Sequence, residues 1–188
     1  LFINKEALEK GANRPKVADQ TVRKVGVLGA GMMGAGIALV AAKAGIEVVL
    51  LDQKQEAADK GKSYTADYYD KGISRKKATA EQKEAALARI TATTDYAALK
   101  GCDLIVEAVF EDMGIKAEVT KKVEEIVGAD CIFASNTSTL PITELAKASK
   151  RPDQFIGIHF FSPVDKMMLV EIIKGKATGD PQDANRRE

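Results

Sequence analysis

Short apolar runs recur along the chain from about residue 23, and each ends at a glycine or at polar side chains. Runs of this kind are typical of strands buried on both faces of a parallel sheet, because such strands have no solvent-facing positions. We predict a strand at each run, namely at residues 25–28, 46–51, 90–93, 104–106, 131–134, 155–158 and 168–173.

Helical patterns fill most of the intervals between these runs. Residues 32–44 are small and apolar on all sides, as in a helix packed closely on a sheet, and Gly45 suits the position that ends a helix. Further helices are predicted at 115–127 and 140–148. Strands that alternate with helices indicate an α/β fold, with a doubly wound, mostly parallel sheet covered on both faces.

The last predicted strand follows Phe160 after a link too short for a helical crossover, so we expect it to run antiparallel at the sheet edge. Residues 53–89 are helical and heavily charged, and we predict a helical hairpin insertion with its break near 72–74. The basic side chains around this break, Lys71 and residues 75–77, suit either a solvated face or the binding of a large anionic substrate.

The positions of glycine, proline and polar residues divide the chain into three parts. Residues 1–21 are polar and interrupted by glycine and proline, and we interpret them as a linker from a preceding domain. Residues 22–176 form the predicted domain, and residues 177–188 a polar, disordered tail.

The 188 residues are 45% hydrophobic and 29% charged, with a formal net charge of +1. This length supports one good core, and the balanced charge argues against nucleic acid as a partner. Cys102 and Cys131 lie in or beside apolar runs, so we expect reduced core thiols rather than a disulfide or a metal site. No apolar run is long enough for a membrane span, and the N-terminus lacks a signal-peptide layout. We therefore expect a soluble, reducing compartment, such as the cytoplasm of a bacterium or the mitochondrial matrix of a eukaryote.

A glycine-rich turn with the sequence GAGMMG, residues 29–34, joins the first predicted strand to the first helix. Gly29 allows the tight turn, Gly31 lets the backbone approach a pyrophosphate, and Gly34 lets the helix lie close on the strand. The helix N-terminus offers unpaired N–H groups to the phosphates. Asp52 ends the second strand, where its carboxylate can accept both hydroxyls of an adenosine ribose and would repel a 2′-phosphate. This combination predicts a Rossmann-type domain that binds NAD in preference to NADP.

His159 is the only histidine, and it stands at the carboxyl end of a predicted strand, the edge at which open α/β sheets bind ligands. If residues 155–161 and 168–173 pair in antiparallel fashion about Asp165, His159 lies opposite Glu171, with Cβ atoms about 5 Å apart. A carboxylate at that range holds the imidazole in one tautomer and makes it a better base, as general-base catalysis near neutral pH requires. A satisfied structural histidine is the alternative.

Two further polar segments end strands on the same edge, residues 107–111 after the fourth strand and residues 135–139 after the fifth. The second segment is alternatively a helix-capping loop, with Ser138 or Thr139 as the cap, since Pro141 follows.

Together these motifs resemble those of the 3-hydroxyacyl-CoA dehydrogenases, above all the dehydrogenase part of the α-subunit of the bacterial fatty-acid oxidation complex. The resemblance covers about residues 22–176. It rests on five motifs in the family's order and spacing: GAGMMG at 29–34, EAVFE at 107–111, SNTS at 135–138, HFFSP at 159–163 and LVEII at 169–173.

The resemblance implies NAD-dependent oxidation of an (S)-3-hydroxyacyl-CoA to the 3-ketoacyl-CoA in fatty-acid β-oxidation. His159 would be the base, Glu171 its orienting partner, and Ser138 would hydrogen-bond the C3 oxygen of the substrate near the nicotinamide. The NAD site would be lined by Gly29, Gly31, Met32, Met33, Gly34, Asp52, Val109, Phe110, Glu111, Lys116, Ser138 and Ser162.

The family further implies a helical C-terminal domain, expected beyond residue 188, that closes over the substrate and commonly builds a dimer. In the bacterial complex it implies association with a thiolase subunit. Two residues depart from the family pattern: Ser162 stands where many members have asparagine, and Met168 stands where a proline is expected. Two other functions stay open, a non-catalytic NAD-binding module and a β-hydroxyacid dehydrogenase of another family, with a lysine base.

Overall fold

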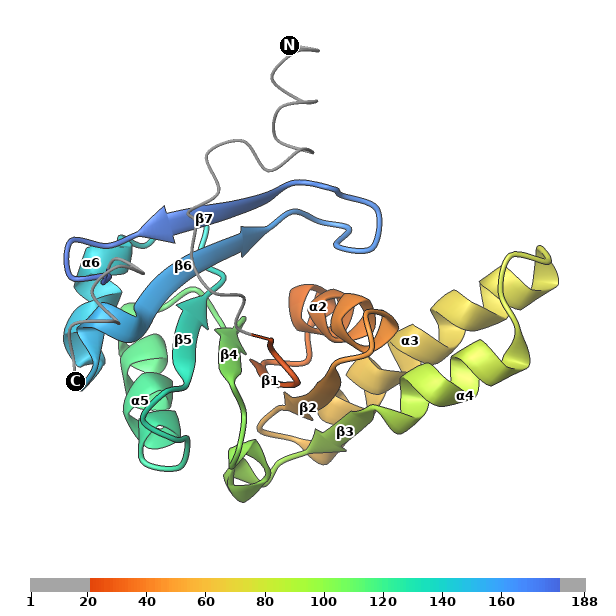
Figure 1. Ribbon diagram of the computed structural model, residues 1–188, viewed down its shortest axis with the longest axis horizontal. Coiled ribbons are helices and arrows are strands. Elements are labelled where there is room, and N and C mark those ends of the chain that lie inside the picture. Colours follow the sequence, from red (N-terminus) through yellow and green to blue (C-terminus); the bar gives the residue numbers. More distant parts are fainter. Residues whose placement is uncertain (1–20, 180–188) are drawn as a thin grey trace, which may run out of the picture. The chain divides into compact units, whose positions relative to one another are not determined.

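A seven-stranded sheet organises the part of the chain that the structure, a computed structural model, describes, which is residues 21–179 (Figure 1). The strand order is β3-β2-β1-β4-β5-β6-β7, and all neighbours pair in parallel except β6 and β7, which are antiparallel. This confirms the predicted doubly wound sheet with an antiparallel edge strand. The bounds are β1 (Lys24–Leu28), β2 (Glu47–Leu51), β3 (Ile90–Thr93), β4 (Leu104–Glu107), β5 (Ile132–Ser135), β6 (Phe155–Phe160) and β7 (Val170–Lys174).

Helices cover both faces of this sheet, with α2, α3 and α4 on one side and α5 and α6 on the other (Figure 1). Short 3₁₀ turns follow β3 (η1), continue α6 (η2) and precede β6 (η3). The bounds are α2 (Met32–Lys43), α3 (Gln55–Ser74), α4 (Ala80–Ala88), η1 (Tyr96–Leu99), α5 (Met113–Glu124), α6 (Ile142–Leu145), η2 (Ala146–Ala148) and η3 (Pro152–Gln154).

Alternate side chains of the central strands β1, β2 and β4 pack into two separate hydrophobic cores. Val25 and Val27 of β1 belong to the core under α2, α3 and α4, whereas Leu28 belongs to the core under α5 and α6. This division follows from the pleat of a strand, which points successive side chains to opposite faces. Cys102 and Cys131 lie in the second core as free, buried thiols, as predicted, and burial raises their pKa values to about 11 and about 12.

The predicted charged helical hairpin is formed by α3 and α4, and its break directly follows the predicted position near 72–74. The helix α3 runs through Gly72 to Ser74, and the chain reverses over residues 75–79. A Cβ at Gly72 would stand 3.0 Å from the Cβ of Ala78, so this glycine serves the close approach of the returning chain and does not end the helix. The helix α4 begins with a capping box. The Thr79 hydroxyl accepts from the N–H of Gln82, and the Gln82 side chain accepts from the N–H of Thr79.

The antiparallel pair β6–β7 has the predicted register, with His159 opposite Glu171. The chain after β7 departs from the expected disorder at its first residues, because Thr178 donates to the carbonyl oxygen of Phe155 at 2.7 Å and accepts from the N–H of Gly175 at 2.8 Å. The predicted linker, up to residue 20, and the tail from residue 180 lie outside the described residues. Within residues 21–179, no helix combines the length and apolar character that a membrane crossing needs.

Candidate active site

The turn between β1 and α2 has the shape that its three glycines predict. Gly29 has φ of 90°, and a Cβ there would stand 2.6 Å from the carbonyl oxygen of Ala108. A Cβ at Gly34 would stand 1.8 Å from the carbonyl oxygen of Gly29, so the helix can lie this close only because the side chain is absent. No atom lies within 4 Å of a Cβ built at Gly31, which leaves open space for a ligand at that point.

The N-terminus of α2 is available to an anion. Gly31 is its N-cap, no side chain caps it, and its first turn contains no acidic residue. The first N–H groups and the partial positive charge of the helix are therefore not used by a side chain of its own first turn. Met32 in this turn is exposed and Met33 is half-buried, and the hydroxyl of Ser162 lies 3.7 Å from the sulfur of Met32.

Asp52 follows β2 and joins the glycine turn to the strand end. One oxygen of its carboxylate accepts from the N–H of Ala30 at 2.7 Å, and the other accepts from the N–H of Gln53 at 2.7 Å. A carboxylate has about four acceptor positions, so each oxygen keeps a lone pair for a ribose hydroxyl. The half-buried negative charge also stands beside the turn, where a 2′-phosphate would be repelled.

His159 and Glu171 face each other across the β6–β7 pair. The Nδ1 atom of the imidazole lies 2.9 Å from Oε2 of the glutamate, and the side chains are 20% and 52% exposed. The ring of Phe161 packs on the imidazole with centroids 4.6 Å apart. Among the described residues, no hydrogen bond occupies the other ring nitrogen, Nε2, which is thus the atom able to take a proton from a bound molecule.

The loop after β5, residues 136–139, is held by Glu111. Its Oε1 atom accepts from the Thr137 hydroxyl at 2.5 Å and from the N–H groups of Ser138 and Thr139 at 3.0 and 3.2 Å. The alternative of a helix-capping role is therefore wrong, because Pro141 occupies the N-cap position of α6 and no side chain caps that helix. Within the described residues, the hydroxyl of Ser138 keeps no hydrogen-bond partner.

The charge of Glu111 is strongly stabilised in this arrangement. Burial alone would raise its pKa, but the Thr137 hydroxyl and the Lys116 ammonium overcome that effect and lower the pKa to about 2. The carboxylate therefore remains an acceptor over the whole range of ordinary assay conditions.

A buried ion pair lies beneath this loop. Lys116 and Glu107 are each 1% exposed, and the ammonium lies 2.7 Å from Oε1 of Glu107 and 3.2 Å from Oε2 of Glu111. The second oxygen of Glu107 accepts from the hydroxyl of Ser135 at 2.7 Å. The resemblance places Lys116 in the lining of the NAD site, whereas its ammonium is enclosed here and also donates to the carbonyl oxygen of Val109 at 3.3 Å. Its observed contacts hold the segment after β4 and, through Glu111, the loop after β5.

The other predicted residues lie at the same edge of the sheet, at the ends of β4 and β6. Val109 is half-buried, and Phe110 is 78% exposed. The amide oxygen of Asn136 accepts from the N–H of Phe160 at 2.8 Å, which ties the loop of Ser138 to the strand that carries His159.

Several residues that shape the site had no role in the sequence analysis. Asn136, Glu107 and Ser135 stand inside recognised motifs, and a carboxylate ending an apolar strand was a usable signal, because a buried charge requires a partner. The hydroxyl of Tyr64 donates to Asp165 at 3.0 Å across 101 residues of chain, and no local pattern could indicate that contact.

Comparison with known proteins places these features in a family. Residues 24–184 match the family model described as 3-hydroxyacyl-CoA dehydrogenase, NAD binding domain. The chain is 44% identical over 181 residues to the fatty acid oxidation complex subunit alpha of Idiomarina loihiensis. It is 50% identical over 157 residues to a probable 3-hydroxybutyryl-CoA dehydrogenase of Deinococcus radiodurans. These alignments cover 96% and 84% of this chain but 25% and 56% of the relatives, so the chain spans between a quarter and about half of their lengths.

Two solved structures of 3-hydroxybutyryl-CoA dehydrogenases are similar to this chain in fold and sequence. The crystal structure of (S)-3-hydroxybutyryl-CoA dehydrogenase from Ralstonia eutropha superimposes with a TM-score of 0.83 at 43% identity, covering 88% of this chain and 59% of that one. A 3-hydroxybutyryl-CoA dehydrogenase from Escherichia coli K12 gives a TM-score of 0.82 at 37% identity, covering 85% and 34%.

Proposed function

The chain belongs to the 3-hydroxyacyl-CoA dehydrogenase family through its NAD-binding domain, and on this premise we propose that it also carries the catalytic base of that reaction. The substrate would be an (S)-3-hydroxyacyl-CoA of fatty-acid β-oxidation, oxidised to the 3-ketoacyl-CoA. The observation that carries the proposal is the His159–Glu171 contact of 2.9 Å at the carboxyl edge of the sheet, the edge that also holds the glycine turn.

The glycine turn supports the cofactor assignment by its fit. The open space at Gly31, the uncapped N-terminus of α2 and the carboxylate of Asp52 suit a pyrophosphate and the ribose beside it. When bound, NAD⁺ supplies the acceptor for the hydride that leaves C3 of the substrate.

The residues of this chain would remove the proton from the substrate and hold the substrate in position. Nε2 of His159 takes the proton of the C3 hydroxyl, and the carboxylate of Glu171 at Nδ1 fixes the tautomer and stabilises the imidazolium that forms. Ser138 offers its hydroxyl to the C3 oxygen while its backbone N–H is held by Glu111. That backbone contact keeps the serine in place without using the side chain.

Apolar side chains at the sheet edge suit a further covering element in a longer protein. Met168 is 88% exposed, Ile172 on β7 is 60% exposed, and Phe110 is 78% exposed. Met168 and Ile172 belong to a nearly continuous exposed apolar stretch over residues 167–173, and a contiguous apolar surface marks an interaction site. We propose that the helical domain implied by the family covers them and closes the substrate site, and that an oligomer and a thiolase subunit are the partners of the whole protein.

The cofactor preference is tested with the chain itself. NADH should bind more tightly than NADPH, because the 2′-phosphate meets the carboxylate of Asp52. Fluorescence titration measures both dissociation constants, and Asp52→Ser should bring them closer together. Equal affinities in the unaltered chain would remove the role assigned to Asp52.

The catalytic proposal is tested in a polypeptide that extends past Glu188 to the length of the relatives. His159→Ala and Glu171→Gln should each lower kcat for (S)-3-hydroxybutyryl-CoA, by about 10²–10⁴-fold for the base itself. NADH affinity should stay nearly unchanged, and Glu125→Gln, far from the pair on the surface, is the matched control. A loss below about threefold in both variants would make His159 a structural residue and favour a non-catalytic NAD-binding module.

A β-hydroxyacid dehydrogenase of another family would carry its lysine base on a helix of a second domain. Such an enzyme would leave the His159–Glu171 contact of 2.9 Å unexplained, and this contact therefore favours the histidine base. In the longer polypeptide, the rates of NADH formation from a short-chain and a long-chain 3-hydroxyacyl-CoA would define the preferred acyl length of the substrate.

A further inference from the structure

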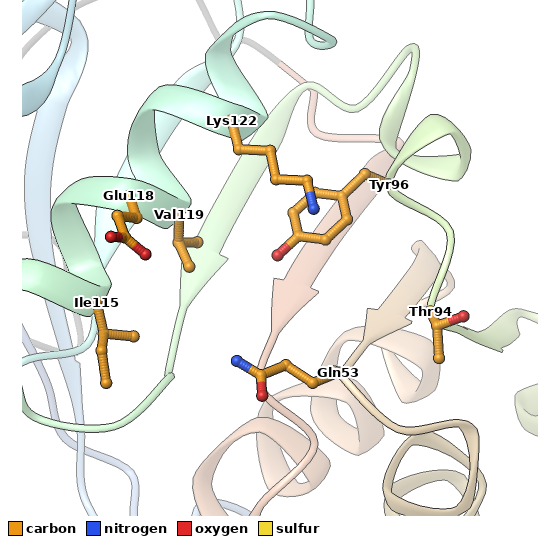
Figure 2. Close-up of a pocket in the computed structure, with 7 residues that line it drawn as sticks. All are labelled: Gln53, Thr94, Tyr96, Ile115, Glu118, Val119 and Lys122. Carbon is orange, nitrogen blue, oxygen red and sulfur yellow. The ribbon is translucent and has the colours of Figure 1, made fainter.

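A pocket of about 380 Å³ lies between the residues that follow β2 and β3 and the face of α5 that carries Ile115, Val119 and Lys122 (Figure 2). Gln53, directly after Asp52, forms one end of it, and Ile115 and Val119 of α5 form an apolar wall. Thr94, Tyr96, Glu118 and Lys122 complete the lining. A flat heterocycle with polar edges fits a pocket with this mixture of apolar wall and convergent polar groups.

Lys122 has an unexpected position in this pocket. Glu118 and Lys122 are four residues apart on α5, the order and spacing that favour an ion pair on a helix. Within the described residues no ion pair joins them, and the ammonium of Lys122 lies over the ring of Tyr96 instead, 3.7 Å from its centroid (Figure 2). This cation–π contact leaves the carboxylate of Glu118 without a hydrogen-bond partner among those residues.

The residue next to the pocket, Asp52, indicates which heterocycle would occupy it. Asp52, the residue before Gln53, is the carboxylate expected to meet the ribose of the adenosine half of the dinucleotide. A base attached to that ribose reaches the adjoining pocket, and its exocyclic amino group is a donor that a carboxylate accepts.

We propose that Glu118 is a specificity-determining residue for the cofactor, accepting from the 6-amino group of adenine, and that Tyr96 keeps it free by holding Lys122. This inference deepens the NAD assignment and rests on it. Hypoxanthine, which carries an oxygen in place of the amino group, places a second acceptor against Glu118 and is rejected.

The test compares the dissociation constants of NADH and reduced nicotinamide hypoxanthine dinucleotide for the 188-residue chain. The unaltered chain should prefer NADH by about tenfold, the order expected for one hydrogen bond to a charged acceptor. Glu118→Gln should reduce the preference below about twofold, because an amide both donates and accepts. Glu125→Gln, at the end of α5 and outside the pocket, should keep the full preference.

A second set of variants isolates the role of Tyr96. Tyr96→Leu should release Lys122 to pair with Glu118 and thereby remove the preference, whereas Tyr96→Phe keeps the ring face and should retain it. Adding Lys122→Met to Tyr96→Leu should restore the preference, since the competing ammonium is then gone. A double variant that stays unselective would overturn the role of Tyr96.

Each failure has a distinct meaning. An unaltered chain that binds neither dinucleotide would contradict the NAD assignment itself. Tight but equal binding of both, or an unchanged preference in Glu118→Gln, would overturn only the inference about Glu118. Free CoA carries the same adenine base, so displacement of NADH by CoA in a manner sensitive to Glu118→Gln would assign the pocket to the substrate and overturn its assignment to the cofactor.

Discussion

The glycine turn after β1 and the loop after β5 lie at the same edge of the sheet, but different forces hold them in place. The turn depends on missing side chains, because a Cβ at Gly29 or Gly34 would stand 2.6 or 1.8 Å from a backbone oxygen. The loop depends on charge, because Glu111 gathers its N–H groups while buried Lys116 holds Glu111 and Glu107. The turn therefore tolerates no side chain at Gly29 or Gly34, whereas the loop depends on keeping its charged partners.

The largest effect is expected in the charged region. Lys116→Met should lower the free energy of unfolding by about 3–5 kcal/mol, because it leaves the buried carboxylate of Glu107 without its counter-ion. The double variant Glu107→Gln, Lys116→Met should recover a large part of that loss, since no buried charge is then unpaired. Urea denaturation measures both, and a loss below about 1 kcal/mol in the single variant would show that the pair is dispensable.

The next effect tests the turn. Gly34→Ala should lower the free energy of unfolding by about 1–3 kcal/mol, since its Cβ meets the oxygen of Gly29. Gly31→Ala is the matched control, because no protein atom lies near its Cβ. It should leave stability unchanged and weaken NADH binding, as measured by fluorescence titration. Equal destabilisation by both substitutions would mean that the two glycines do not have separate roles.

A smaller effect concerns pH and belongs to the loop alone. The folded-state pKa of Glu111 is about 2 against an ordinary value of 4.5, so its carboxylate stabilises the fold fully above about pH 4.5. That contribution is lost as the pH falls from 4.5 towards 2, because the unfolded chain binds the proton more readily. Glu111→Gln should flatten the stability profile in this window. A profile parallel to that of the unaltered chain would contradict the assignment.

The smallest effect is expected at a contact outside both regions. Tyr64 of α3, the helix packed on α2, donates to Asp165 in the link between His159 and Glu171. Tyr64→Phe should lower the free energy of unfolding by about 0.5–1.5 kcal/mol, the value of one hydrogen bond. Tyr96→Phe removes a hydroxyl that has no hydrogen bond among the described residues and should have no effect on stability. Similar losses in both would show that the loss of any tyrosine hydroxyl, and not the loss of this hydrogen bond, is responsible.

The turn was predictable from sequence because its requirements are local. Gly29, Gly31 and Gly34 each have a steric reason that spacing alone reveals. The register of His159 with Glu171 was predictable for a similar reason, since one centre at Asp165 fixes every pair of an antiparallel hairpin.

The charged region was not predictable in the same way. Lysine is rarely buried, so the enclosure of Lys116 opposes the average preference of its residue type. Its partners come from the end of β4 and the segment after it, and the loop that it supports follows β5, so only the assembled sheet brings them together. Gly72 shows the limit of a local pattern, because this glycine near the predicted break lies inside α3 and permits close packing against Ala78.

The antiparallel edge pair has a consequence for the order of folding. His159 and Glu171 are only 12 residues apart in the chain, whereas the contacts of Asp52 with Ala30 and of Ser135 with Glu107 join residues 22 and 28 apart. A hairpin closes a short loop and forms on the microsecond scale, while parallel strands must wait for a crossover helix. We therefore expect His159 and Glu171 to align as a local event, before the edge of the sheet that carries the glycine turn is complete.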